Sequence, residues 1–199
     1  PAFLFYLTDF ADLPVGERAL ASLFQAVTPR TAGYNTVDLT KMRDTSQAVT
    51  ILLMLTGGAP GSTAGGMKVT TLAVLIANAA AAFHRREDSR LFDRRLDYSA
   101  VRNAAAILLL YLSLTFVGAA VISEVEGLPL GACLYETASA AGTVGLTLGL
   151  TPQLGTLSQS ILILLMFFGR VGGLTLIYAA FSGHDLTYAR YPKEMITVG

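Results

Sequence analysis

The sequence is poor in charge, has a single cysteine and lacks tryptophan. Only 14% of its 199 residues are charged, against about 25% in a typical soluble domain. Its formal net charge is zero, which removes the electrostatic argument for a nucleic-acid partner. Cys133 alone cannot form an internal disulfide framework. An intramembrane hydrolase would need a nucleophile and a base that face each other inside the bilayer. The apolar stretches offer no such base, so this class of enzyme is not indicated.

The sequence contains long runs without a charged residue. The run 104–123 is twenty residues without a charge, the length that crosses about 30 Å of hydrocarbon. The run 45–83 is interrupted only by Lys68, and the run 137–181 only by Arg170. The composition, 53% hydrophobic with a mean hydropathy of +0.55, therefore predicts an all-α transmembrane protein embedded in a lipid bilayer.

The arginines are concentrated in one connecting segment. Residues 84–102 contain Arg85, Arg86, Arg90, Arg94, Arg95 and Arg102. Residues 123–152 contain no lysine or arginine. Because basic residues accumulate in cytoplasmic loops, we predict that the loop 84–97 and the tail 182–199 both lie in the cytoplasm.

The chain contains one module twice, at an offset of 112 residues. Without a gap, Thr-x-Gly at 31–33 aligns with 143–145, and Ser-Gln at 46–47 with 158–159. The same offset aligns Gly57, Gly61 and Thr63 with Gly169, Gly173 and Thr175. An internal repeat of this kind has to be settled before the fold is assigned. In membrane transporters such repeats usually surround the substrate path.

Each copy is predicted to hold a spanning helix, a short re-entrant helix, an extended turn and a second spanning helix. In the first copy the short helix covers about 16–27, the turn 29–38, and the second helix begins near Ser46. In the second copy these elements are predicted at 98–123, 129–140, 142–152 and 154–181. The short helices have the length expected of re-entrant segments, which do not cross the bilayer.

The two turns are candidate selectivity filters. A dehydrated monovalent cation needs several oxygen ligands, and a short Thr-x-Gly strand can aim consecutive carbonyls at one axis. The negative C-terminal ends of the short helices would favour a cation there. The alternative is an ordinary turn at the membrane surface. The candidate filter residues are Thr31, Ala32, Gly33, Tyr34, Thr143, Val144, Gly145 and Leu146.

A glycine-rich stretch at 56–66 interrupts an apolar run and is a candidate gate. Unpaired backbone groups cost several kcal/mol each in lipid, so such a stretch must face protein or a water-filled cavity. It lacks the Gly-Lys-Ser/Thr ending of a phosphate-binding loop. We interpret it as a flexible break below the filter. The candidate gate residues in and beside it are Gly57, Gly58, Pro60, Gly61, Ser62, Thr63, Gly65, Gly66 and Lys68.

Two cations interrupt the apolar runs and need partners. Each would cost roughly 2.5–3.5 kcal/mol near the bilayer centre. Lys68 either joins the gate or extends toward the cytoplasmic interface. Arg170 aligns with Gly58 at the 112-residue offset. We predict that Arg170 donates hydrogen bonds to carbonyls of 56–66 and holds that stretch shut.

Four motifs carry a resemblance to a known family. They are PRTAGYNTVD at 29–38, GGAPGSTAGGMK at 57–68, TVGLT at 143–147 and GRVGGLT at 169–175. With them the chain resembles the C-terminal half of a Trk/Ktr-type potassium transporter membrane subunit, from the superfamily that also holds the plant HKT transporters. The tail at 190–199 resembles Ktr-type subunits in particular.

The resemblance implies four helix–pore-loop–helix repeats around one potassium pathway. Residues 1–83 would be a truncated third repeat, 84–97 a cytoplasmic loop, 98–181 the fourth repeat and 182–199 a cytoplasmic tail. Gly33 and Gly145 would be the filter glycines, 56–67 the intramembrane gating loop, and Arg170 the arginine that faces it. No covalently bound cofactor is implied; K⁺ is the transported ion, and Na⁺ as an activator stays open.

The resemblance also implies partners and a location. Such subunits are homodimers in the bacterial inner membrane, docked on a cytosolic ring of nucleotide-binding regulatory subunits. The arginine loop and the tail would be the docking surface. The N-terminal half, with repeats one and two, would be needed to complete the filter.

Two other functions remain open at this point. One is secondary transport of another small solute, on inverted repeats around broken helices; the other is a sodium-permeable transporter of the same fold. A membrane enzyme that uses the glycine stretch for a phosphate substrate would need an acidic metal ligand nearby, and 45–83 contains none. We therefore predict a transporter and not an enzyme.

Overall fold

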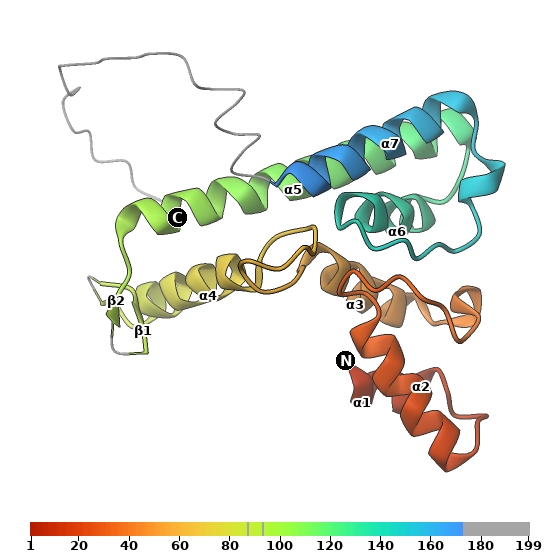
Figure 1. Cartoon of the computed structure of the whole chain (residues 1–199), viewed down its shortest axis with the longest axis horizontal. Coiled ribbons are helices and arrows are strands. Elements are labelled where there is room, and N and C mark those ends of the chain that lie inside the picture. Colours follow the sequence, from red (N-terminus) through yellow and green to blue (C-terminus); the bar gives the residue numbers. More distant parts are fainter. Residues whose placement is uncertain (87, 93, 173–199) are drawn as a thin grey trace.

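The computed structural model describes residues 1–172 except 87 and 93, and this part is built almost entirely from α-helices (Figure 1). The helices are α1 (Ala2–Thr8), α2 (Val15–Val27), α3 (Asp44–Leu55), α4 (Val69–Phe83), α5 (Tyr98–Glu126), α6 (Leu130–Ala141) and α7 (Thr156–Val171), with 3-10 turns at Leu39–Lys41 and Thr151–Gln153. The predicted all-α class is therefore confirmed for the described residues.

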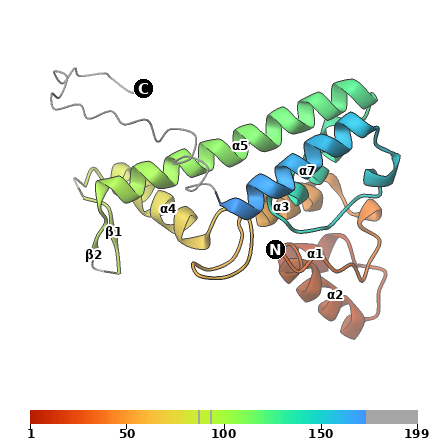
Figure 2. The ribbon, with the colours of Figure 1, turned by 45° about the horizontal axis from the view of Figure 1, so that its top comes forward.

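The second repeat is the better enclosed of the two. Among the described helices only α5 is long and apolar enough to cross a membrane by itself. Its buried residues recur every three or four positions and form one face, as expected of a helix packed on one side: Ala104, Ile107, Tyr111, Thr115, Gly118, Ala119 and Ile122. This face packs on α6 and α7, and α7 runs beside α5 in both views (Figures 1 and 2).

The short helix α6 lies at the centre of the described structure. It begins after Pro129 and is buried almost throughout its second half, from Tyr135 to Ala141. Alanine, serine and threonine dominate this half, and their small side chains let α3, α5 and α7 all pack against it. The C-terminal end of α6 is thereby held inside the protein.

The first repeat contains the predicted broken helix. Its two halves, α3 and α4, are each shorter than a membrane span, and residues 56–68 form a loop between them (Figure 1). The neck of the loop is closed, because Gly57 N donates to Met67 O at 2.7 Å and Met67 N donates to Leu55 O at 3.0 Å. The loop is thus a closed excursion between the two helices.

The repeated Ser-Gln pair marks the same helix start in both copies. Asp9 accepts hydrogen bonds from the Ser46 hydroxyl at 2.5 Å and from the backbone amide three residues earlier at 2.9 Å. Glu126 accepts from the Ser158 hydroxyl at 2.6 Å and from the corresponding amide at 2.8 Å. A carboxylate at the end of α1 or α5 therefore caps α3 and α7 in the same way, and stabilises these otherwise unpaired first amides.

The structure adds detail to two predicted segments. Within the predicted loop 84–97, Arg90–Leu91 and Arg94–Arg95 pair as the two antiparallel strands β1 and β2. The last described helix, α7, ends at Val171, because Gly172 has a φ of +92°, which is incompatible with a right-handed helix. The predicted segment 173–181 and the tail 182–199 lie outside the described residues.

Candidate functional site

The two predicted filter turns lie in contact. A Cβ atom placed on Gly33 would come within 2.1 Å of the carbonyl oxygen of Val144 and 3.7 Å from the Cα of Gly145. One turn follows α2 and the other follows α6, so the 112-residue repeat brings equivalent positions together in space. The candidate filter turns 29–38 and 142–152 thus pack directly on each other.

The turns share an unusual backbone conformation. Thr31 and Gly33 have φ values of +67° and +74°, and their equivalents Thr143 and Gly145 have values of +53° and +92°. The residue between each pair is not in this left-handed region. The predicted extended strand is therefore wrong at the two threonines.

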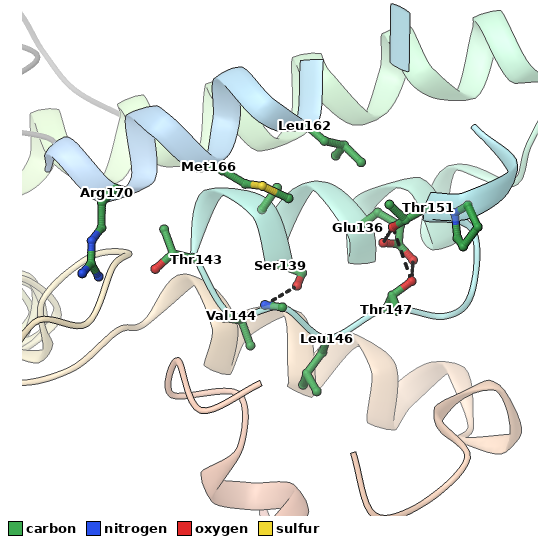
Figure 3. A pocket seen from close by; sticks show the side chains of 13 residues that line it. Glu136, Ser139, Thr143, Val144, Leu146, Thr147, Thr151, Leu162, Met166 and Arg170 are labelled. Carbon is green, nitrogen blue, oxygen red and sulfur yellow. Dashed lines mark hydrogen bonds between the residues drawn. The ribbon is translucent and has the colours of Figure 1, made fainter. Parts of the chain in front are cut away.

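The end of α6 explains why a threonine adopts this conformation. Thr143 N donates to Ala140 O at 3.0 Å and Val144 N donates to Ser139 O at 2.9 Å. This is the Schellman arrangement, which ends a helix by a left-handed residue and usually employs glycine there. Thr143 occupies the glycine position. Gly145 N donates to Ser139 Oγ at 3.2 Å (Figure 3), so the amides of this turn face back to α6.

The first turn is held similarly by the end of α2. The amides of Ala32 and Gly33 donate to Thr28 O at 3.1 and 3.2 Å. The hydroxyl of Thr28 donates to Tyr34 O at 2.7 Å. The side chain of Tyr34 is exposed, whereas that of its equivalent Leu146 is buried. The two turns are thus alike in backbone and different in side-chain environment.

The carbonyl oxygens of the turns are left available. Within the described residues no hydrogen bond is accepted by the carbonyls of Thr31, Ala32, Gly33, Thr143, Val144 and Gly145. No cluster of His, Cys, Asp or Glu side chains suited to a metal ion occurs in this part of the chain. The backbone oxygens, next to the negative end of α6, are therefore the candidate cation ligands.

Glu136 supports the second turn, and the sequence analysis did not identify it. Its side chain is buried on α6 and accepts hydrogen bonds from Thr147 Oγ1 at 2.6 Å, Leu148 N at 2.9 Å and Thr151 Oγ1 at 2.7 Å (Figure 3). Three hydrogen-bond donors offset the desolvation cost of burying this carboxylate. The signal in the sequence was an acidic residue inside an otherwise apolar re-entrant helix.

The end of the first turn carries an exposed acid. Asp38 accepts hydrogen bonds from Thr40 Oγ1 at 2.6 Å and from Thr40 N at 3.1 Å. The hydroxyl bond of Thr40, with the backbone bond beside it, holds the pKa of Asp38 below its usual value. Asp38 is therefore ionised at neutral pH and fixes the 3-10 turn that leads into α3.

The glycine-rich loop is bound by the two cations that the sequence singled out. Lys68 Nζ donates to Ala64 O at 2.6 Å and to Ser62 O at 3.2 Å. Arg170 Nη1 donates to Thr63 O between them, and Figure 3 shows the guanidinium at the end of α7 directed at the loop. The predicted hydrogen bond from Arg170 is present. Two positive charges thus hold three consecutive carbonyls at the tip of the loop.

A third cation binds the loop, and the sequence analysis missed it. Arg30 Nη1 donates to Thr56 O at 3.1 Å and lies 3.4 Å from Gly57 O. Arg30 belongs to the first turn, immediately before Thr31. Its position next to a filter motif gave no indication that its side chain reaches a segment 26 residues further along the chain.

The loop also touches the second turn. A Cβ atom on Gly65 would lie 2.1 Å from Thr143 Oγ1, so glycine is required for this approach. A Cβ atom on Gly169 would lie 2.0 Å from Ala141 O and 3.1 Å from Thr143 Cγ2. Thr143 is therefore enclosed between the loop and α7.

A cavity of about 580 Å³ adjoins these groups. It lies between α7, the end of α6 and the turn that follows, with Glu136 at one end and Arg170 at the other (Figure 3). Thr143 and Met166 also line it. The arrangement brings the backbone oxygens of the second turn, the cavity and the glycine-rich loop together.

The comparisons with known proteins agree on one family. The family model of TrkH, described as a cation transport protein, matches residues 2–185. The chain is 38% identical over 187 residues to the Ktr system potassium uptake protein B of Bacillus subtilis, and 38% identical over 189 residues to the potassium/sodium uptake protein NtpJ of Enterococcus hirae. These matches cover 94% and 92% of this chain, but only 42% of each relative.

A solved structure has the same fold. The potassium transporter TrkH from Vibrio parahaemolyticus superposes with a TM-score of 0.73 at 23% sequence identity. The superposition covers 89% of this chain and 40% of that protein. The chain thus spans about two fifths of the length of the proteins that it matches.

Proposed function

Because the chain belongs to the TrkH family of cation transport proteins, we propose that it forms part of a potassium uptake pathway across the cell membrane. The observation that carries this proposal is the contact between the two turns, through Gly33 and the carbonyl of Val144. Both turns leave carbonyl oxygens without internal donors, so they can replace the hydration shell of a cation.

The filter in this proposal consists of the backbone oxygens of 31–34 and 143–146. The ends of α2 and α6 bind the amides of residues 32, 33, 143 and 144, so the turns are held before an ion arrives. The oxygens of 31–33 and 143–145 accept no hydrogen bond within the described residues, whereas that of Tyr34 accepts one from Thr28 Oγ1. The helix dipole of α6 adds a favourable field for a cation. Selectivity then depends on the spacing of the oxygens and not on side-chain chemistry, which is why Gly33 and Gly145 are the sensitive positions.

The gate in this proposal is the loop 56–66. Arg170 on α7 binds the Thr63 carbonyl at its tip, which keeps the loop beside the turns, whereas Lys68 binds Ser62 and Ala64 within the loop. Both side chains add positive charge to the path of a cation. Movement of the loop away from α7 requires the Arg170 bond to break. Since a hydrogen bond to a charged group contributes about 1.5–3 kcal/mol, its loss would favour an open path.

We assign the remaining parts of the subunit by the same proposal. Residues 1–83 and 98–181 are the third and fourth repeats, joined by the cytoplasmic loop 84–97 and followed by the cytoplasmic tail 182–199. The apolar face of α2 supports further repeats, because Leu20, Leu23 and Val27 are more than half exposed, whereas the equivalent helix α6 is enclosed. A preceding N-terminal half would cover this face and add two more filter strands.

Partners complete the proposal. The exposed arginines of β1 and β2 and the tail would dock a homodimer of the complete subunit onto a cytosolic ring of nucleotide-binding regulatory subunits. The name of one relative, Ktr system potassium uptake protein B, supports a multicomponent system. Na⁺ is proposed only as an activator of K⁺ flux.

A second candidate is a transporter that also conducts Na⁺. It is favoured by the name of the equally similar relative from Enterococcus hirae, a potassium/sodium uptake protein. Both candidates share the filter and the gate described above. They differ in the ratio of K⁺ to Na⁺ permeability, which is therefore the quantity to measure.

The test is ion uptake by the complete gene product, including whatever precedes residue 1, in cells that lack their own potassium uptake. We expect growth at low K⁺ and Rb⁺ accumulation from the complete product, and neither from residues 1–199 expressed alone. A K⁺-to-Na⁺ ratio near one would favour the second candidate. Absence of flux of either ion through a folded, membrane-inserted complete product would refute the proposal.

A further inference from the structure

The glycine-rich loop is attached to the first filter turn. Arg30 lies directly before Thr31, and its guanidinium binds the carbonyls of Thr56 and Gly57 at the start of the loop. Both acceptors lie at the neck, where Gly57 is also paired with Met67. A displacement of the neck therefore pulls on the residue that precedes the first filter oxygens.

The far arm of the loop is attached to the second filter turn. Gly65 approaches Thr143 so closely that a Cβ atom there would lie 2.1 Å from its hydroxyl oxygen. Gly169 of α7 encloses the same side chain from the other side. Thr143 holds a left-handed backbone conformation, which costs a residue with a side chain roughly 1–2 kcal/mol. Its conformation therefore depends on what surrounds it.

We infer that Arg30 and Thr143 are positioning residues that couple the loop to both filter turns, so that the loop and the filter change conformation together. Arg30 acts through the neck of the loop, and Thr143 through Gly65. The inference rests on the proposed function and extends it: when the loop moves, the oxygens that select the ion move as well. Gating and ion selectivity are then one property of this protein.

The first experiment measures two quantities in the complete protein, the rate of K⁺ uptake and the K⁺-to-Na⁺ permeability ratio. Arg30→Gln removes the charge and shortens the reach to Thr56. We expect it to raise the uptake rate and to lower the permeability ratio at least about threefold. Arg30→Lys retains the charge but lacks the planar fork of donors, and should restore the ratio in part. Arg43→Gln is the matched control, because Arg43 is an exposed arginine of the same repeat.

The second experiment is a double-mutant cycle on the other attachment. Gly65→Ala places a methyl group against Thr143 and should lower the permeability ratio. Thr143→Gly removes the obstructing side chain at a position whose φ of +53° suits glycine. In the Thr143→Gly background, Gly65→Ala should therefore have little further effect, which gives a large coupling term.

The outcomes distinguish a failure of the proposed function from a failure of the coupling. If the unmodified complete protein carries no K⁺, the proposed function itself is wrong. If it carries K⁺ and the variants change the uptake rate while the permeability ratio stays constant, the coupling is wrong and the filter proposal stands. Additive effects in the Gly65–Thr143 cycle would also overturn the coupling. Should Gly65→Ala not reach the membrane, the Arg30 pair decides alone.

Discussion

Gly33 and Val144 meet at the contact between the two repeats: a Cβ atom on Gly33 would lie 2.1 Å from the Val144 carbonyl oxygen. The backbones of the two turns thus pack directly against each other. A side chain added at Gly33 cannot be accommodated by a rotamer change, because the obstructing atom belongs to the backbone. The position of an oxygen in one repeat therefore depends on the absence of a side chain in the other.

Serine at either filter glycine is expected to lower the K⁺-to-Na⁺ permeability ratio, and by different amounts. Both positions have a left-handed φ, +74° at Gly33 and +92° at Gly145, which costs a non-glycine residue roughly 1–2 kcal/mol. Only Gly33 adds the collision with Val144. We expect Gly33→Ser to reduce the ratio at least about tenfold, as 1.4 kcal/mol corresponds to tenfold, and Gly145→Ser to reduce it less. Reversal potentials or competitive Rb⁺ uptake measure the effect.

Gly149→Ser is the matched control for these variants. Gly149 has a φ of +87° and lies in the same turn as Gly145, but a Cβ atom there meets nothing within 4 Å. Backbone strain without displacement of a filter oxygen should leave the permeability ratio unchanged. Equal ratios in Gly33→Ser and the unmodified protein would exclude this filter.

Arg170→Ala is expected to increase the rate of K⁺ uptake. The guanidinium of Arg170 binds the Thr63 carbonyl at the tip of the loop, and a charged hydrogen bond of this kind contributes about 1.5–3 kcal/mol. Its removal should raise the open fraction about tenfold or more. Arg170→Lys, which keeps the charge as a single point donor, should lie in between. Unchanged flux and gating in Arg170→Ala would remove this residue from the mechanism.

The sequence predicted the parts of the fold that depend on hydrophobic periodicity and on the repeat. The run at 104–123 lies inside α5, and the glycine-rich break separates α3 from α4. The offset also made the turns at 29–38 and 142–152 equivalent, and they lie in contact in the structure. Each of these features rests on many residues or on agreement between the two copies of the repeat, so one atypical residue does not hide it.

The contacts that fix the turns could not be predicted in this way. Thr31 and Thr143 adopt a conformation that is usual for glycine. Thr143 does so because it ends α6 and not because of its own propensity. Asp9 and Glu126 perform the same capping task, yet they are not related by the 112-residue offset. Arg30 and Glu136 act through side chains whose partners are far along the chain, and only the assembled fold identifies those partners.

Glu136→Gln is expected to loosen the second turn and lower the permeability ratio. The carboxylate accepts from two hydroxyls and one amide, and glutamine offers only one oxygen for them. Leaving buried polar groups unpaired costs about 1–3 kcal/mol, and the affected residues directly follow the filter. The melting temperature of the detergent-solubilised protein and the permeability ratio should both fall.

The control for Glu136 is Gln153→Ala, which removes a weaker 3.4 Å contact to Gly149 O at the edge of the same turn. It should change neither quantity measurably. If Glu136→Gln lowers the melting temperature while the permeability ratio is kept, Glu136 contributes to stability alone and has no part in placing the filter oxygens.

The two capping carboxylates provide a test of whether the repeats are stabilised independently. Asp9→Asn and Glu126→Gln each weaken a helix start that binds a serine hydroxyl and a backbone amide. Loss of such a cap costs about 1 kcal/mol, or about 2–4 °C in melting temperature for a chain of this size. Because the two sites share no partner, the double variant should lose the sum of the single effects. Glu124→Gln changes an exposed acid two residues from Glu126 and should leave the melting temperature unchanged. A double variant that loses much more than the sum would mean that α3 and α7 unfold as one unit, through the contacts that both make with α6.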